Sequence, residues 1–452
     1  MIDLKDKKII VIGLARTGAA VARCCRGLGA RVLVVERSAK PADPVQAASL
    51  LSLGIELVFG AHDQQVLAGA DLIIPSPGVS PSAPVLGQAI DSGLPVISEI
   101  ELAFQLTSRP IIAVTGTNGK TTTTTLIGEI LQAAGKAADV CGNIGRPMIE
   151  AVGTDASAPL VVEVSSFQLE FVDKFRPHIG VLLNIAPDHL DWHEDIEAYR
   201  AAKLKMFKHQ TTRDWAVAGV DCASFIAGTR GRKLVFGGDR GVFTEGGWIR
   251  HDLNGESIGI VPIDELVVRG EHNVANAMAA AAVALIEGVD EETIALSLRE
   301  FRGVEHRLEQ VMRDNGVIFY NDSKATNPAA AITALRAFSG GIILLAGGRN
   351  KGNSFEELAR EAAGRVKLAV LFGESAPDLS AALARHSVPV SRAGSLDEAV
   401  RTGAGAAGSG DVVLLAPACA SFDMFSDYEE RGRVFKAAVR AEVRSLAKRK
   451  SN

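Results

Sequence analysis

The sequence predicts an α/β fold in which helices cover parallel β-sheets. Short runs of β-branched and other aliphatic residues recur along the chain and end near glycine, proline or an acidic residue, as buried parallel strands do. Segments with helical apolar spacing separate these runs. The alternation restarts twice within 452 residues, a length that suits several domains of roughly 100–200 residues each. We therefore expect three α/β domains in series.

The first domain is predicted over residues 1–104. Its first strand is Lys8–Gly13 (KIIVIG), and an apolar-periodic helix over Gly18–Gly29 follows. Because a strand, a helix and a second parallel strand form a βαβ unit, we expect a Rossmann-like domain here. The other predicted strands are Arg31–Glu36, Asp71–Ile74 and Pro95–Ile97.

A second domain is predicted over residues 105–302. Strands are expected at Ile111–Thr115, Leu160–Val164 and Ile179–Leu183, and an alanine-rich helix at Asn273–Glu287. Residues Gly237–Pro262 contain short strand patterns between glycine-rich turns, which predicts a hairpin excursion. The remainder of this block is expected to form a parallel sheet with helices on its faces.

The third domain is predicted over residues 303–452 and is expected to be Rossmann-like as well. Its predicted strands, with helices between them, are Val317–Tyr320, Gly341–Ala346, Val366–Phe372 and Val412–Ala416. In sheets of this kind, ligands bind at the carboxyl ends of the strands.

Composition excludes several classes of protein. The net charge is −5 with both signs scattered along the chain, so no basic stripe predicts a nucleic-acid partner. The chain has no run of about 20 apolar residues that is free of charge, so the sequence predicts no membrane span. The five cysteines are sparse and form no CxxC pair, and the N-terminus enters a strand without an apolar leader, so we expect a cytoplasmic protein.

The sharpest local pattern is TGTNGKTT at Thr115–Thr122, between a predicted strand and a predicted helix over Thr121–Ala134. Glycines there let backbone N–H groups face phosphates, the lysine neutralises the outer phosphates and the following threonine can bind Mg²⁺. The usual GxxxxGK[ST] pattern has glycine where this chain has Val114, so the loop is a variant. The competing interpretation is an ordinary strand–turn–helix connection with a surface lysine.

The variant loop and its threonine-rich helix resemble the Mur ligase family. The resemblance implies a central P-loop ATPase-like domain and an ATP-dependent ligase that forms an amide bond through an acyl-phosphate, in cytoplasmic synthesis of peptidoglycan precursors. It also extends to GEHNVANAMAA, EHRLE and NDSKATNP further along the chain. The nucleotide contacts that it implies are Gly116, Thr117, Asn118, Gly119, Lys120, Thr121, Thr122, Asn273, Arg307 and Asp322. By itself, Asn273 also reads as a helix N-cap.

Three further segments resemble the magnesium site of the family. They are VVEVSSFQLE with Glu163, NIAPDHLDWH with His189, and YRAAKLKMF with Lys203. The resemblance implies two Mg²⁺ ions held through Thr121, Glu163, His189 and Lys203, with Lys203 carbamylated, and a catalytic set of Lys120, Glu163, His189 and Lys203. Taken alone, the segments also fit a solvent-exposed strand end, a zinc-binding or plain polar loop, and a surface lysine.

The first domain carries GLARTG at Gly13–Gly18, which is similar to a dinucleotide-binding loop but has Ala15 in place of the middle glycine. A dehydrogenase is one interpretation of this loop, and a plain βα turn is another. Resemblance to the Mur ligases implies instead that this domain binds the UDP of a sugar substrate. The implied contacts are Arg16, Thr17, Glu36, Arg37 and Asn143.

NDSKATN and PACASFDMF, in the third domain, closely resemble the members of the family that add D-glutamate. The resemblance implies the substrates UDP-N-acetylmuramoyl-L-alanine and D-glutamate, and we expect a monomer. The implied amino-acid contacts are Lys324, Thr326, Lys351, Ser421 and Phe422. A folylpolyglutamate synthase and a nucleotide-gated regulatory protein remain alternatives, but neither is expected to need all of these segments together.

Overall fold

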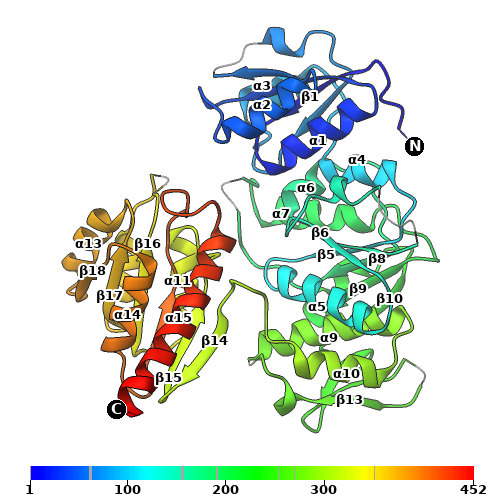
Figure 1. Cartoon of the computed structure of the whole chain (residues 1–452). Coiled ribbons are helices and arrows are strands. Elements are labelled where there is room, and N and C mark those ends of the chain that lie inside the picture. The colour runs from blue at the N-terminus through cyan, green and yellow to red at the C-terminus, as the bar shows by residue number, and fades with distance from the viewer. Residues whose placement is uncertain are drawn as a thin grey trace. The chain divides into compact units, whose positions relative to one another are not determined.

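Three β-sheets with helices packed on them make up the described chain (Figure 1). The structure is a computed structural model that describes residues 2–60, 64–153, 157–189, 192–253, 255–268, 270–350 and 352–451. The chain divides into two compact units, Met1–Phe301 and Arg302–Asn452, of which the first holds two sheets and the second holds one. The predicted α/β fold is confirmed. The domain boundaries predicted near residues 105 and 303 stay predictions.

The first sheet is parallel and has the strand order β3-β2-β1-β4. Its strands are β1 (Lys8–Ile12), β2 (Arg31–Glu36), β3 (Glu56–Phe59) and β4 (Leu72–Pro75), and its helices are α1 (Arg16–Gly27), α2 (Pro44–Ser52) and α3 (Pro84–Asp91). The strand predicted at Pro95–Ile97 is wrong, because this segment forms only an isolated bridge between Val96 and Ile73. Proline has no N–H to extend that pairing.

The central sheet has the order β13-β12-β11-β10-β9-β8-β5-β7-β6, with β5 (Ile111–Thr115) completely buried in its interior. The other strands are β6 (Asp139–Gly142), β7 (Leu160–Glu163), β8 (Ile179–Leu182), β9 (Trp215–Gly219), β10 (Arg232–Phe236), β11 (Val242–Glu245), β12 (Trp248–His251) and β13 (Ile258–Pro262). Strands β11 to β13 pair antiparallel, so the hairpin excursion predicted from the glycine-rich turns is confirmed. The remaining pairs are parallel, which brings the carboxyl ends of β5, β7 and β8 to one edge.

Helices α5 (Lys120–Ala133), α9 (Glu271–Ile286) and α10 (Glu291–Glu300) pack together beside this sheet (Figure 1). Helix α4 (Glu99–Leu106) enters the central domain and is tied to it by its buried Glu99, which accepts a hydrogen bond from the Ile149 N–H at 2.6 Å. Two shorter helices, α6 (Ser166–Glu170) and α7 (Ile196–Leu204), follow β7 and β8 in the sequence. Both carry residues of the candidate site.

The second unit contains a sheet of order β14-β15-β19-β16-β17-β18, in which only β14 is antiparallel to its neighbour. The strands are β14 (Glu309–Asp314), β15 (Val317–Asn321), β16 (Ile342–Gly347), β17 (Val366–Phe372), β18 (Val390–Arg392) and β19 (Val412–Leu415). Helices α11 (Pro328–Arg336), α12 (Glu356–Ala362) and α13 (Ala376–Arg385) contribute to one apolar cluster, and α14 (Leu396–Ala406) and α15 (Tyr428–Ser451) to the other.

The five cysteines are free thiols, and four of them are shielded from solvent. Cys25, Cys141, Cys222 and Cys419 are buried, and Cys24 is half-buried. Burial raises the pKa of Cys25 and of Cys141 to about 12 and that of Cys419 to about 11. These thiols therefore pack as small apolar groups.

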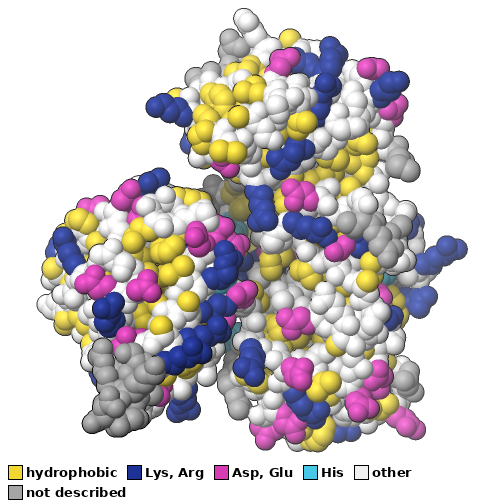
Figure 2. Space-filling view, viewed as in Figure 1, with side chains coloured by type: hydrophobic (Ala, Val, Ile, Leu, Met, Phe, Trp, Pro, Cys, Tyr) yellow, Lys and Arg dark blue, Asp and Glu magenta, His cyan; other side chains and the backbone are white. Residues whose placement is uncertain are grey.

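Charged side chains of both signs are spread over the face shown in Figure 2, and basic side chains gather along the exposed side of α15. None of the helices in the described part of the chain is both long and apolar enough to cross a membrane.

Candidate active site

The phosphate-loop pattern forms the predicted connection between β5 and α5. Gly116 and Gly119 have φ values of 157° and 83°, which L side chains rarely adopt. A Cβ at Gly119 would lie 2.2 Å from Asn276 Oδ1, and one at Gly116 would lie 2.9 Å from Leu183 Cβ. Both glycines are therefore required by backbone conformation and by close neighbours.

Polar contacts from β8 and its following loop fix the phosphate loop. The Asn118 N–H donates to Asn184 Oδ1 at 2.8 Å, and Asn184 Nδ2 donates back to the Asn118 carbonyl at 3.1 Å. The buried Thr117 hydroxyl accepts the Ala186 N–H at 2.9 Å and lies 3.1 Å from the Tyr199 hydroxyl. Such closed side-chain networks rigidify a loop in advance of ligand binding.

Asn276 in α9 is a site residue that the sequence did not reveal. Its Oδ1 accepts from the Thr123 hydroxyl of α5 at 3.3 Å, and its Nδ2 donates to Asn273 Oδ1 at 3.4 Å. It thus joins the predicted nucleotide contact Asn273 to the start of α5. The available signal was the spacing of the two asparagines in HNVAN, three residues apart on one helical face.

Lys120 begins α5 and turns back over the loop. Its Nζ donates to the carbonyls of Gly116 and Thr117 at 3.0 and 2.8 Å. Thr121, next along the helix, is buried at 3% exposure, and Thr122 is half-buried. The positive end of the helix, the ammonium group and the glycine-rich backbone therefore converge at one place, which is the arrangement that anions favour.

Glu163 ends β7 beside Val114 of β5, so it lies next to the base of the phosphate loop. It is 2% exposed. Its Oε1 accepts from Asn143 Nδ2 at 2.7 Å, whereas its buried Oε2 has no hydrogen-bond partner. A buried carboxylate oxygen without a donor is costly, and a cation is the partner that would relieve this cost.

Lys203, in the last turn of α7, is 1% exposed. Its Nζ donates to the Gly116 carbonyl at 2.9 Å, approaches Thr115 Oγ1 at 3.5 Å and lies 4.4 Å from the centre of the Tyr199 ring. Burial, together with the charge of Lys120, lowers the pKa of Lys203 to about 7. The interpretation of Lys203 as a surface lysine is therefore wrong.

His189 has a left-handed backbone, with φ of 53°. Its ring packs edge-on against Phe167 of α6 at 4.8 Å between centroids, and its Nε2 lies 3.5 Å from Asp188 Oδ2. The ring of Phe167 also stacks with that of the buried His193. The Nε2 atom of His193 lies 3.0 Å from Ser166 Oγ. Burial lowers the pKa of His193 below its usual value.

Four of the five predicted UDP-binding residues lie at the carboxyl ends of β1 and β2, whereas Asn143 follows β6 in the central sheet and donates to Glu163. Arg16 and Thr17 open α1, and Glu36 ends β2. Glu36 accepts the N–H groups of Leu14 and Ser38, each at 2.9 Å. Burial alone would raise the pKa of Glu36, but these hydrogen bonds outweigh it and hold the pKa below its usual value. Arg37 is exposed beside it.

In the second unit, Asp322 follows β15, and burial raises the pKa of its carboxyl to about 6 even though the Leu308 N–H donates to it at 3.2 Å. The charges of Arg307 and Lys324 oppose that rise, so both cations are near. Arg307 is exposed, and Lys324 is half-buried. In this unit the structure therefore brings Arg307, Asp322 and Lys324 together near the carboxyl end of β15.

The remaining predicted contacts of this unit differ in exposure. Thr326 is half-buried, Ser421 is 2% exposed and Phe422 is 58% exposed. Lys351 lies outside the described residues.

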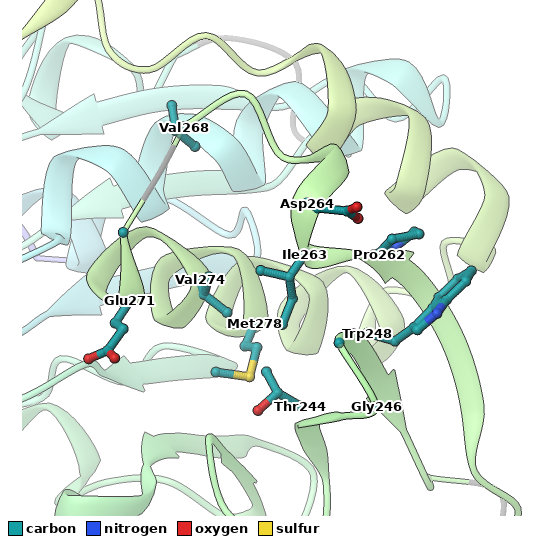
Figure 3. Close-up of a pocket in the computed structure, with 12 residues that line it drawn as sticks. Thr244, Gly246, Trp248, Pro262, Ile263, Asp264, Val268, Glu271, Val274 and Met278 are labelled. Carbon is teal, nitrogen blue, oxygen red and sulfur yellow. The ribbon is translucent and has the colours of Figure 1, made fainter.

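Two other features involve none of the residues predicted for this site. A cavity of about 980 Å³ lies between the β11–β12 hairpin and α9, where Val274 and Met278 point toward Thr244 (Figure 3). Glu305, His306 and Glu309 form a group that has the spacing of metal ligands, but Lys436 already binds both carboxylates.

The chain is similar to known domain families and to known proteins. The Mur ligase MurD-like N-terminal domain matches residues 7–98, the Mur ligase middle domain matches residues 114–284, and the Mur ligase glutamate ligase domain matches residues 306–419. A UDP-N-acetylmuramoylalanine–D-glutamate ligase of Thermoanaerobacter pseudethanolicus is 40% identical over 98% of this chain and 100% of its own length. The chain belongs to the Mur ligase family. A second Mur ligase of the same name, from Pelotomaculum thermopropionicum, is 44% identical over 97% of this chain and 98% of its own.

Solved Mur ligase structures share the fold. The UDP-N-acetylmuramate-alanine ligase MurC of Thermotoga maritima has a TM-score of 0.55 at 21% identity and covers 96% of this chain, with 99% of its own length covered. The MurF ligase of Thermotoga maritima, solved in complex with ADP, has a TM-score of 0.53 at 16% identity and covers 99% of this chain and 100% of its own. With three Mur ligase domains in series, the predicted domain architecture is confirmed.

Proposed function

We propose that the chain joins the amine of D-glutamate to the carboxylate of UDP-N-acetylmuramoyl-L-alanine and converts ATP to ADP and phosphate, in peptidoglycan precursor synthesis. The full-length identity of 40–44% to ligases of that name supports the choice of substrates. The single structural observation that carries the chemistry is that the phosphate loop is flanked by both a buried Glu163 oxygen without a hydrogen-bond partner and a buried Lys203 that donates to the loop.

The proposed reaction has two steps. The alanyl carboxylate attacks the γ-phosphorus of ATP, which forms an acyl-phosphate and releases ADP. The glutamate amine then attacks the acyl carbon, the C–O bond to phosphate breaks, and phosphate and one proton leave as the amide forms. Lys120 and the N–H groups of the loop stabilise the charge of the transferred phosphoryl group, because positioning and electrostatics dominate such transfers.

The residues at the loop fit a magnesium site. Mg²⁺ prefers one or two carboxylates together with phosphate and water oxygens. Glu163 offers a buried oxygen without a donor, and Thr121 offers a hydroxyl next to Lys120. When bound, the ions would neutralise charge on the phosphates. We assign Thr121, Glu163, His189 and Lys203 as their ligands, and two ions to the site.

Carbamylation of Lys203 is part of the proposal. An amine must be neutral to add CO₂, and a pKa of about 7 leaves a large neutral fraction at physiological pH. The product is an anion with two oxygens, which a cation would balance in this buried position. In the unmodified protein, the amines of Lys120 and Lys203 both donate to the carbonyl of Gly116.

Each substrate is assigned its own set of residues. We assign nucleotide contacts to Gly116–Thr122, Asn273, Arg307 and Asp322, and UDP-sugar contacts to Arg16, Thr17, Glu36, Arg37 and Asn143. Lys324, Thr326, Lys351, Ser421 and Phe422 are assigned to D-glutamate. Cations and hydroxyls suit a substrate with two carboxylates. We further propose that the protein acts as a monomer in the cytoplasm, which sedimentation and fractionation would test.

Phosphate release with ATP, Mg²⁺ and UDP-N-acetylmuramoyl-L-alanine tests this function. The release should depend on D-glutamate and should be far slower with L-glutamate or without an amino acid. Equal rates with both enantiomers would remove the D-glutamate assignment. Release that needs neither acceptor nor amino acid would favour a nucleotide-binding regulatory protein instead.

A further inference from the structure

Arg431 is a buried cation at the carboxyl edge of the third sheet. It lies in the first turn of α15 and is 0% exposed. Within the described residues, no carboxylate oxygen approaches its guanidinium to 4.0 Å. Burying a guanidinium away from both water and carboxylates is expensive, and packing alone does not require it. The hydrogen-bond partners of Arg431 therefore indicate the structural role of its burial.

The guanidinium joins the loops that follow two different strands. Its Nε donates to Ser323 Oγ at 3.0 Å and its Nη2 to the Ser323 carbonyl at 2.9 Å, both in the loop after β15. Its Nη1 donates to the Cys419 carbonyl at 3.1 Å, in the loop after β19. The Ser323 hydroxyl in turn donates to the Tyr428 carbonyl at 2.8 Å, at the start of α15. The fork of the arginine is well suited to hold such a junction.

A third loop leaves room for this junction. Gly348, directly after β16, has a φ of 132°, and a Cβ there would lie 3.2 Å from Arg431 Nη1 and 2.2 Å from the Ala420 carbonyl. The same loop pairs with the β19 loop, since Arg349 and Ala420 exchange backbone hydrogen bonds of 2.9 and 3.1 Å. The loops after β15, β16 and β19 therefore meet at Arg431.

These loops carry the residues assigned to the amino-acid substrate. Lys324 follows Ser323 directly, and Ser421 lies two residues after Cys419. We infer that Arg431 is a positioning residue for the incoming amino acid, because it sets the separation of the Lys324 and Ser421 loops and places a positive charge beneath them. This inference rests on the proposed function and concerns how the same site selects a dianionic amino acid.

The charge of Arg431 persists at neutral pH. Burial lowers the pKa of its guanidinium to about 10, with the Cys419 thiol and the Asp423 carboxyl opposing that change. A buried charge acts over a longer distance than a surface charge because less solvent screens it. The carboxylates of a bound amino acid would therefore be attracted without touching the guanidinium.

Steady-state kinetics of Arg431→Lys and Arg431→Ala test the inference, with Arg440→Ala as the matched control on the exposed side of the same helix. The wild type is first shown to release phosphate with D-glutamate. We expect the KM for D-glutamate to rise about tenfold to a hundredfold in both Arg431 variants, while the KM for ATP changes by less than about threefold. Millimolar guanidinium chloride should restore part of the D-glutamate affinity to Arg431→Ala only.

Thermal unfolding of each variant separates positioning from general loss of structure. If Arg431→Ala is too unstable to assay, Ser323→Ala removes only the hydroxyl that accepts from Nε and should raise the same KM by a smaller factor. Unchanged KM for D-glutamate in the folded variants, or equal rises in the KM of both substrates without guanidinium rescue, would overturn the inference while the function stands. Absence of D-glutamate-dependent release in the wild type would overturn the proposed function, and this inference with it.

Discussion

A single buried amine, that of Lys203, links the structure to a chemical modification. Because its pKa is about 7, the amine is mostly protonated at pH 6 and mostly neutral at pH 8. Protein depleted of CO₂ should therefore regain activity on adding bicarbonate faster and more completely at pH 8 than at pH 6. Measured rates of phosphate release against bicarbonate at both pH values check this. Lys203→Ala should be inactive at every bicarbonate concentration, and a variant that keeps full activity would remove Lys203 from the mechanism.

Glu163 offers a second test at the residue scale. Glu163→Gln keeps the size of the side chain and leaves Oε1 to accept from Asn143, but removes the negative charge. Activity should fall about a hundredfold to a thousandfold, in the range measured when one group that stabilises transition-state charge is lost. The thermal midpoint should not fall, because the substitution removes a buried negative charge and leaves a neutral amide in its place. The readouts are phosphate release over a Mg²⁺ titration and thermal unfolding; unchanged activity at low Mg²⁺ would contradict the metal assignment.

Two polar residues show what sequence reasoning misses at this scale. Asn276 and Arg431 sit in patterns that are common on solvent-exposed helices, HNVAN and EERGR. Their roles come from partners outside their own helices, namely Thr123 for the first and Ser323 and Cys419 for the second. Local periodicity contains no information about such contacts, because it describes only one element at a time.

At the scale of elements, the turn from β5 to α5 depends on Gly119. Gly119→Ala places a methyl group on a left-handed backbone and against Asn276 Oδ1, so it should abolish measurable ATP binding. Gly135→Ala, after the same helix, is the matched control, since its φ is 72° but no atom lies within 4 Å of the added Cβ. Calorimetric titration with an ATP analogue and thermal unfolding compare the two variants. Similar ATP affinity in both would contradict the role of Gly119.

Elements were predicted best where several buried aliphatic residues stand together. Ile111–Thr115, Arg31–Glu36 and Val366–Phe372 form strands with the predicted bounds. Strand β9 (WAVAG) was not predicted, because alanine and glycine carry little strand signal. Pro95–Ile97 was predicted in error, because it forms only an isolated bridge between Val96 and Ile73 and Pro95 has no N–H to extend the pairing.

For the whole molecule, the division into two compact units has a proteolytic consequence. Each unit has its own apolar clusters, and the exposed Arg302 lies in the segment that joins them. Limited trypsin digestion should cut at Arg302 early and leave two fragments that resist further cleavage. Mass spectrometry of a digestion time course identifies the cuts. Loss of either fragment before the other accumulates would show that the units do not hold their folds separately.

The sequence predicted the α/β class, the number of domains and the position of the phosphate loop, because each depends on local patterns that recur. The substrate could not be predicted from physical chemistry alone. Lys324, Thr326 and Ser421 suit any small dianion, and the identity of that dianion comes from the resemblance to D-glutamate ligases.

The shielded cysteines give this protein a practical property. Because four native thiols are buried and burial raises their pKa values, we expect them to react slowly with maleimide reagents at neutral pH. A pair of cysteines introduced at exposed positions, one in each compact unit, would therefore accept donor and acceptor dyes with little background once half-buried Cys24 is replaced by serine. Energy transfer between those dyes would report the separation of the two units in solution as each substrate is added.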